Sequence, residues 1–302
     1  MTQAMIPIVD THTHFWNPQR LHYPWLGNVP SLQKDFGVED YQRATSAIPI
    51  EKMVFVECNC LPEQARDEVI WAKELARIDP RIKGMVPYAN LTDTETIDAV
   101  LDEYAADPFI RGIRHNIQWN PKGFALQPAF IEGIHKVSRK GFHFELCITC
   151  DQLEEVLELV RQCGEVSLVL DHCGKPAIKR GEIEPWKSQI QRLARFSNVH
   201  CKISGLLTES DFKNWSDDQL EVYASHIADC FGAHRIMFGS DWPVLELAGK
   251  YQDWYDFTLQ LSEGWGESEK RSFYHENALY FYRLSNPPGI PSCLTSPTKP
   301  RS

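Results

Sequence analysis

The stretch Ile8-Val9-Asp10-Thr11-His12-Thr13-His14-Phe15-Trp16 stands near the start of a chain of 302 residues. Its apolar beginning predicts a first strand over residues 6–10, and two histidines follow that strand. Side chains at positions i and i+2 of an extended chain point to the same side, so His12 and His14 should project together. Two imidazoles on one side suit a metal such as zinc, or a cluster that polarises a carbonyl group.

The same pattern recurs along the chain: a β-rich apolar run, then a segment with apolar residues at helical spacing. The predicted strands after the first are 52–57, 82–91, 109–115, 142–148, 166–172, 199–204 and 235–241. The predicted helices are 38–46, 62–78, 93–105, 127–140, 151–163, 185–196, 216–230, 250–262 and 267–283. The segment 15–37 is rich in aromatic residues and is long for a connection, and such loops are often functional.

This alternation predicts an α/β fold, a closed (β/α)8 TIM-type barrel that forms a single domain over residues 1–285. The competing architecture is an open doubly wound sheet. Against it, no Gly-x-Gly-x-x-Gly follows the first strand, and no phosphate-binding Gly-Lys-Ser/Thr loop appears. Residues 286–302 are rich in proline and serine, so we expect them to form a short disordered tail outside the fold.

Composition and charge exclude several classes of partner. The chain is 43% hydrophobic and 24% charged, as an ordinary globular protein with a large core is. Its net charge of −10 argues against nucleic acid and anionic membrane surfaces, which both need basic patches. We find no apolar run of about 18 residues and no signal region, so we expect a cytoplasmic protein without membrane spans.

Nine cysteines are scattered along the chain. The spacings Cys58-x-Cys60 and Cys147-x-x-Cys150 resemble metal or redox pairs, but each lacks the second pair that a zinc ribbon needs. Cysteine is also a common small apolar core residue, and we expect these thiols to be reduced and structural.

Polar residues gather at the ends of the predicted strands, or within them, where apolar residues would otherwise stand. In barrels of this type the chemistry lies at the carboxyl ends of the strands. Each of these residues alone has an ordinary structural explanation, such as capping the next helix. Their shared position on one face predicts a common pocket. The residues are His12, His14, Glu57, Arg114, His115, Glu145, His172, Lys202 and Asp241.

Three stretches resemble the amidohydrolase superfamily, most closely its metal-independent or weakly metal-dependent lactonase branch. They are His12-Thr13-His14, Leu170-Asp171-His172-Cys173-Gly174-Lys175-Pro176 and Phe238-Gly239-Ser240-Asp241-Trp242-Pro243. Smaller matches resemble sugar-lactone hydrolases of the L-fuconolactonase and L-rhamnonolactonase type, which are related to 2-pyrone-4,6-dicarboxylate lactonase. These matches are Tyr23-Pro24-Trp25-Leu26, Arg111-Gly112-Ile113-Arg114-His115, Val199-His200-Cys201-Lys202-Ile203-Ser204-Gly205 and Glu276-Asn277-Ala278.

The resemblance, which extends over residues 6–284, implies catalytic roles for two residues. Asp241 matches the aspartate of the eighth strand, the general base that takes a proton from water and returns it to the departing ring oxygen. His172 matches the histidine of the sixth strand and would help to polarise the carbonyl. The implied reaction opens a sugar-derived lactone, an aldonolactone, to the free acid.

The resemblance also implies a metal site, because His12 and His14 match the paired histidines of the first strand. The sequence departs from the binuclear members of the superfamily. No lysine ends the fourth strand, and Glu145 stands where many relatives have a metal-binding histidine. We therefore expect at most one divalent metal such as zinc, bound by His12 and His14 with Asp241 or Glu145. A metal-independent reaction stays open, because imidazoles and a cationic side chain could stabilise an oxyanion unaided.

The expected partner is a small-molecule lactone, and a homo-oligomer stays open. Glu57, Arg114, His115 and Lys202 could form hydrogen bonds with sugar hydroxyls. Trp25 and Trp242 could pack on the apolar face of the sugar. These six residues are our predictions for substrate binding.

Two alternatives to an aldonolactone hydrolase stay open. The first is another hydrolase or a decarboxylase of the same superfamily that acts on a pyrone or carboxylate substrate. A dicarboxylate would need several arginines in the pocket, and Arg114 is the arginine that we expect there. The second is a non-catalytic binding barrel, which we would expect to have lost the base, whereas Asp241 is present.

Overall fold

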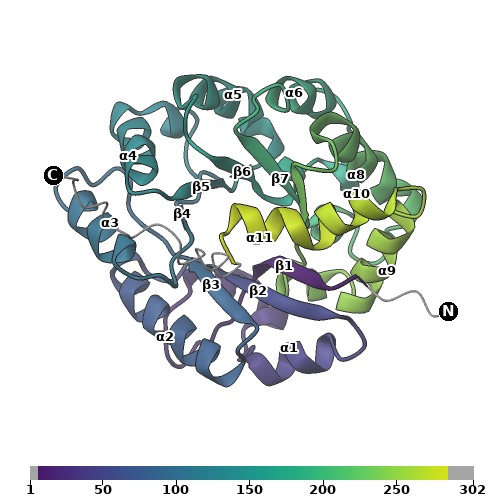
Figure 1. The fold of residues 1–302 in the computed structure, drawn as a ribbon, viewed down its shortest axis with the longest axis horizontal. Coiled ribbons are helices and arrows are strands. Elements are labelled where there is room, and N and C mark those ends of the chain that lie inside the picture. Colours follow the sequence, from purple (N-terminus) through teal and green to yellow (C-terminus); the bar gives the residue numbers. More distant parts are fainter. Residues whose placement is uncertain (1–5, 285–302) are drawn as a thin grey trace, which may run out of the picture.

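The computed structural model describes residues 6–284, and its strands and helices alternate along the chain (Figure 1). The strands are β1 (Ile8–Thr13), β2 (Ile50–Val56), β3 (Ile82–Val86), β4 (Gly112–Arg114), β5 (His143–Leu146), β6 (Leu168–Leu170), β7 (Val199–Ile203) and β8 (Ile236–Phe238). The helices are α1 (Val38–Ala44), α2 (Ala65–Ile78), α3 (Ile97–Ala105), α4 (Pro128–Arg139), α5 (Leu153–Gln162), α6 (Trp186–Leu193), α7 (Leu206–Glu209), α8 (Asp217–Phe231), α9 (Tyr251–Leu261), α10 (Glu267–Arg271) and α11 (Asn277–Phe281). The predicted tail, 286–302, lies outside the described residues.

The strands form a closed parallel barrel. Two hydrogen-bonded sheets, β1-β2-β3 and β4-β5-β6-β7-β8, contribute all eight strands. A parallel bridge between Thr13 and Trp242 joins β1 to the segment after β8, and another between Met85 and Ile110 joins β3 to the segment before β4. Figure 1 shows the helices arranged around this ring of strands. The predicted (β/α)8 barrel is therefore confirmed.

Several element boundaries differ from the prediction. β1 continues to Thr13, because the peptide of Asp241 donates to His12 O at 2.9 Å and His14 donates to Trp242 O at 2.8 Å. These bonds hold the first strand extended as far as its histidines. The predicted strand 82–91 ends at residue 86, and the predicted helix 267–283 is interrupted by a π-helical turn at Ser272–Glu276. The short helix α7 was not predicted.

Helix α11 covers the end of the barrel where the strands begin. Valines of four strands form an apolar cluster inside the barrel, and Ala278 and Phe281 of α11 pack against them. Asn277 donates to Ile236 O at 2.7 Å, which fixes α11 beside the first residue of β8. Figure 1 shows α11 lying across the ring of strands. Since this end is covered, the carboxyl ends of the strands are left for the site. The interior valines are Val9, Val54, Val56, Val86 and Val169.

The aromatic segment 15–37 packs beside the end of β8. Trp16 and Phe36 pair through backbone hydrogen bonds of 3.2 and 3.0 Å, which close the segment into a loop. The ring of Trp242 packs edge-on against Phe36 at 5.7 Å and also contacts Phe15 and Tyr41. The long connection therefore forms part of the wall at the carboxyl ends of the strands.

Two expectations from composition can be followed in the structure. No helix within residues 6–284 is long and apolar enough to cross a bilayer. The cysteines in the described part of the chain are free thiols, and Cys58, Cys147, Cys163, Cys173 and Cys201 are buried.

Candidate active site

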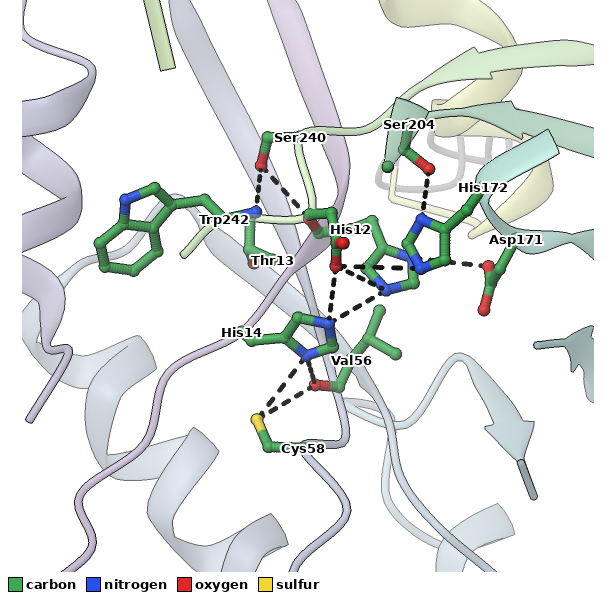
Figure 2. A network of polar contacts seen from close by, with 12 residues as sticks. His12, Thr13, His14, Val56, Cys58, Asp171, His172, Ser204, Ser240 and Trp242 are labelled. Carbon is green, nitrogen blue, oxygen red and sulfur yellow. Dashed lines mark hydrogen bonds and ion pairs between the residues drawn. The ribbon is translucent and has the colours of Figure 1, made fainter. Parts of the chain in front are cut away.

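A cluster of histidines and one carboxylate lies at the carboxyl ends of β1 and β8 (Figure 2). Because of their spacing on β1, His12 and His14 point to the same side, and their Nε2 atoms are 3.1 Å apart. Asp241 Oδ1 lies 3.3 Å from His14 Nε2 and 3.8 Å from His12 Nε2. The structure therefore brings together three of the predicted site residues, although 229 positions separate the first from the last along the chain.

His172 completes the cluster from the turn that follows β6. Its Nε2 lies 3.8 Å from Asp241 Oδ1, and its Nδ1 lies 2.9 Å from the hydroxyl of Ser204. The residue after Ser204 is glycine for a steric reason. A Cβ at Gly205 would lie 2.7 Å from His172 Nδ1, and the φ of Gly205 is +66°. Ser204 and Gly205 therefore set the orientation of the imidazole.

Asp10 fixes the loop that carries the carboxylate. Its Oδ2 accepts hydrogen bonds from Ser240 Oγ at 2.6 Å and from Tyr251 OH at 2.7 Å, and its Oδ1 accepts from the Ser240 peptide at 2.9 Å. Ser240 Oγ in turn accepts from the Trp242 peptide at 3.0 Å. Asp241 lies between these two anchored residues with a left-handed φ of 62°. The network holds a strained residue in place, and such strain is commonly found at functional sites.

Burial and charge set the protonation of the cluster. Burial lowers the pKa of His172 to about 4, and burial with the nearby charge of Lys202 lowers the pKa of His12 well below its ordinary value. Burial alone would raise the pKa of Asp241, but the surrounding imidazoles, His172 foremost, hold it below the ordinary value because they attract the carboxylate when they carry a proton. Near neutral pH the cluster therefore contains neutral His12 and His172 beside an ionised carboxylate.

A layer of buried ion pairs lies against the histidines inside the barrel. Lys202 Nζ lies 2.7 Å from Glu145 Oε2 and 3.0 Å from Asp171 Oδ1. Arg114 Nε donates to Glu57 Oε1 at 2.6 Å. Burial alone would raise the pKa of Asp171, but the charge of Lys202 brings it down to about 2. These cations and carboxylates therefore compensate one another within the protein.

The cluster fits a single divalent metal. His12, His14 and Asp241 each offer a ligand atom, and all these atoms lie within 4.8 Å of one another. His14 Nδ1 lies 2.8 Å from Val56 O, and donation to that carbonyl leaves the Nε2 lone pair directed at the cluster. Two imidazole nitrogens and a carboxylate oxygen are a common donor set for zinc. Glu145 belongs to neither metal-competent group of the described residues, because Lys202 and Tyr282 engage its oxygens.

A cavity of about 210 Å³ opens above the cluster. Its volume is below the roughly 300–1,000 Å³ that is typical of pockets for drug-sized ligands, so it suits a small substrate. Five of its lining residues have left-handed backbone conformations that residues other than glycine rarely adopt. They are Asn59 (φ 53°), Trp119 (φ 68°), His172 (φ 51°), Lys175 (φ 49°) and Asp241 (φ 62°).

Only some of the predicted site residues line this cavity. Trp25 and Arg114 do so, together with His14, His172 and Asp241, and Trp25 is fixed by a hydrogen bond of 2.8 Å to Cys58 O. The other four predicted substrate contacts, Glu145 and His12 do not line it. Lys202 and Glu57 form the ion pairs described above, Trp242 is fully buried in the aromatic wall, and His115 packs between Phe124 and Phe130.

The sequence reasoning missed four polar or aromatic residues of the cavity wall. Lys175 lies in a stretch that carries the family resemblance, and that signal could have identified it. Asn59, Gln118 and Trp119 lie in loops after β2 and β4, where no periodicity marks them. Their positions depend on how the loops fold over the barrel.

Comparisons with known proteins agree with this geometry. The family model described as amidohydrolase matches residues 9–284. The L-fucono-1,5-lactonase of Burkholderia ambifaria is 29% identical over 93% of this chain and 97% of its own length. A crystal structure of an amidohydrolase from Burkholderia multivorans with bound zinc is 26% identical, with a TM-score of 0.84 over 92% of this chain and 100% of that one.

A more distant likeness concerns the fold alone. The crystal structure of a 2,6-dihydroxybenzoate decarboxylase is 16% identical, with a TM-score of 0.67 over 92% of this chain and 100% of that one. The family model, in contrast, matches this chain from β1 to the end of the described residues. The chain therefore belongs to the amidohydrolase family, as the resemblance of its sequence implied.

Proposed function

We propose that the chain is a lactonase that opens a sugar-derived lactone, an aldonolactone, to the free acid. The observation that carries this proposal is the Asp241 carboxylate, which lies among His12, His14 and His172 at the floor of a small cavity. The similarity to the L-fucono-1,5-lactonase of Burkholderia ambifaria supports a lactone as the substrate.

The proposed mechanism begins with the carboxylate. Asp241 is ionised and acts as the general base that takes a proton from a water molecule. The oxygen of this water forms a bond to the lactone carbonyl carbon, and the imidazole groups stabilise the negative charge on the carbonyl oxygen. The bond from that carbon to the ring oxygen then breaks, and Asp241 returns its proton to the departing alkoxide. The product is an open-chain hydroxy acid.

His12 and His14 with Asp241 would hold a divalent metal in this site. Such a metal, when bound, supplies Lewis-acid polarisation of the carbonyl and lowers the pKa of a coordinated water. The chain itself holds the carboxylate in place through Ser240 and Asp10, and it orients His14 through Val56 O.

The charges of the cavity wall favour a neutral lactone over a dicarboxylate. Arg114 is the only arginine that lines the cavity among the described residues, and its charge is compensated by Glu57 at 2.6 Å. A dicarboxylate would need several uncompensated cations, and apart from Arg114 the only lysine or arginine that lines the cavity within residues 6–284 is Lys175. This arrangement argues against the pyrone dicarboxylate alternative.

A panel of aldonolactones with a pH indicator tests the proposal. We expect acid release from at least one neutral five- or six-membered aldonolactone at a rate well above spontaneous hydrolysis. Elemental analysis of the purified enzyme should give at most one equivalent of divalent metal per chain. If no aldonolactone is hydrolysed, with and without added zinc, the proposed function is wrong.

A further inference from the structure

Lys175 is a cation of the cavity wall that has no carboxylate in direct contact among residues 6–284, although the charges of Glu209 and Asp241 act on it from farther away. Its Nζ donates a hydrogen bond to the neutral amide oxygen of Gln118 at 2.7 Å. An ammonium group has three donors, so others remain for a ligand. Because Glu209 and Asp241 favour the charged form of Lys175 without contacting it directly, its remaining donors can bind the oxygens of a ligand.

The loop after β4 presents Gln118 to this lysine and places Trp119 beside it. The peptide of Gln118 donates to Cys147 O at 3.0 Å, and Asn120 donates to Ile117 O at 3.1 Å, which fixes the turn. Trp119 lines the cavity although 70% of its surface is exposed. Its left-handed φ of 68° is an outlier for a bulky side chain. Strained backbone conformations of this kind cluster at binding and catalytic sites.

The three side chains offer two kinds of contact to a sugar. The indole face of Trp119 suits the apolar C–H face of a ring, and the ammonium of Lys175 and the amide of Gln118 suit hydroxyl oxygens. None of the three belongs to the cluster of His12, His14, His172 and Asp241, so the reaction itself leaves them without a role.

We propose that Lys175, Gln118 and Trp119 form the specificity-determining part of the cavity, which binds the hydroxyl-bearing carbons of the substrate. This inference rests on the proposed lactonase function and deepens it. The substrate class is thereby narrowed to neutral polyhydroxylated lactones, because Asp241 in the same cavity repels an added carboxylate.

The test compares two lactones of the same ring size, a polyhydroxylated 1,5-lactone and the unsubstituted δ-valerolactone. In the wild type the polyhydroxylated lactone should have the higher kcat/KM. In Lys175→Met the ratio of the two kcat/KM values should fall roughly 10- to 100-fold, mainly through KM, because a charged hydrogen bond is lost. Lys175→Arg should retain most of the ratio. Gln118→Leu and Trp119→Ala should each also lower the ratio of the two kcat/KM values.

Matched controls make the result decisive. Lys179 is an exposed lysine on the same segment, and Lys179→Met should leave the ratio unchanged. If Lys175→Met lowers kcat/KM equally for both lactones, the inference is overturned, because the result would show that Lys175 acts on the lactone group itself. A wild-type preference for a lactone that carries a carboxylate would also overturn it.

Binding of lactams separates this inference from the proposed function. Polyhydroxylated 1,5-lactams and unsubstituted δ-valerolactam resist hydrolysis, and calorimetry measures their affinity directly. The wild type should bind the polyhydroxylated lactam more tightly, and Lys175→Met should lose this preference. If lactams behave in this way but no lactone is hydrolysed, the proposed function fails and the inference stands. If the wild type has no such preference, the inference fails whatever the hydrolysis shows.

Discussion

Two lysines near the histidine cluster have opposite environments. Lys202 is fully buried inside the barrel, between the carboxylates of Glu145 and Asp171 at 2.7 and 3.0 Å. Lys175 lies in the cavity wall and contacts the neutral amide of Gln118. The first ammonium contacts two carboxylates directly, whereas the second contacts none and keeps hydrogen-bond donors for a ligand.

This difference distinguishes residues that position the catalytic cluster from residues that recognise the substrate. Lys202 Nζ lies 3.1 Å from His12 Nδ1, so the buried layer contacts the cluster directly. Arg114 belongs to both regions, because it lines the cavity and pairs with Glu57. A polar residue at the end of a barrel strand therefore does not by itself identify a substrate contact. The partners that already occupy its hydrogen-bonding atoms decide its role.

The largest effect is expected for Asp241→Asn, which removes the base from the floor of the cavity. Asparagine has nearly the same shape but cannot accept the proton, so kcat should fall roughly 10²- to 10⁴-fold. Circular dichroism and a thermal melt should show a folded protein. Retention of more than about a tenth of the wild-type rate would contradict the role of Asp241.

The two lysines themselves give the next prediction. Lys202→Met leaves two buried carboxylates without their cation, and the free energy of unfolding should fall by about 3–5 kcal/mol. Lys175→Met is the matched control and should lower it by less than about 1 kcal/mol. Urea unfolding of both variants measures this difference. Equal losses would show that the two environments are not distinct.

Ser240→Ala tests the network that holds the catalytic loop. The change removes a hydrogen bond of 2.6 Å to the buried carboxylate of Asp10. Loss of a hydrogen bond to a charged group should cost about 1.5–3 kcal/mol of stability. Because the same loop carries Asp241, kcat should fall more than KM rises. Steady-state kinetics with a denaturation curve would detect a purely structural effect, in which stability falls and kcat is unchanged.

The smallest effect concerns His115, which belongs to neither region. Burial lowers its pKa from 6.5 to about 4, so the unfolded chain binds a proton in this interval that the folded chain does not. Stability is therefore lost as the pH falls through this window. Since the ring is partly exposed, we expect about 1 kcal/mol between pH 7 and pH 5. His115→Asn should show a smaller loss and an unchanged KM, and a raised KM would place His115 in the site.

Much of the fold could be predicted because local patterns determine it. Alternating β-rich runs and helical segments indicated eight units, and the missing phosphate-binding motifs argued against an open sheet. Boundaries were less predictable where long-range bonds decide them. β1 reaches Thr13 because the segment after β8 pairs with it, and the final helix is broken at residues 272–276.

The sequence by itself determined that His12, His14, His172 and Asp241 would meet, because each follows or ends a strand and the carboxyl ends of barrel strands converge. It also determined which residues carry charge, but not which charges are compensated. Only the tertiary structure decided that Lys202 pairs with Glu145 and Asp171, that Glu57 pairs with Arg114, and that Trp242 packs in the core. The tertiary structure also decided that Lys175, Gln118 and Trp119 face the cavity. The physical reason is that a side chain's role depends on neighbours distant in sequence, and loop conformations at left-handed φ values place those neighbours without any periodic signal.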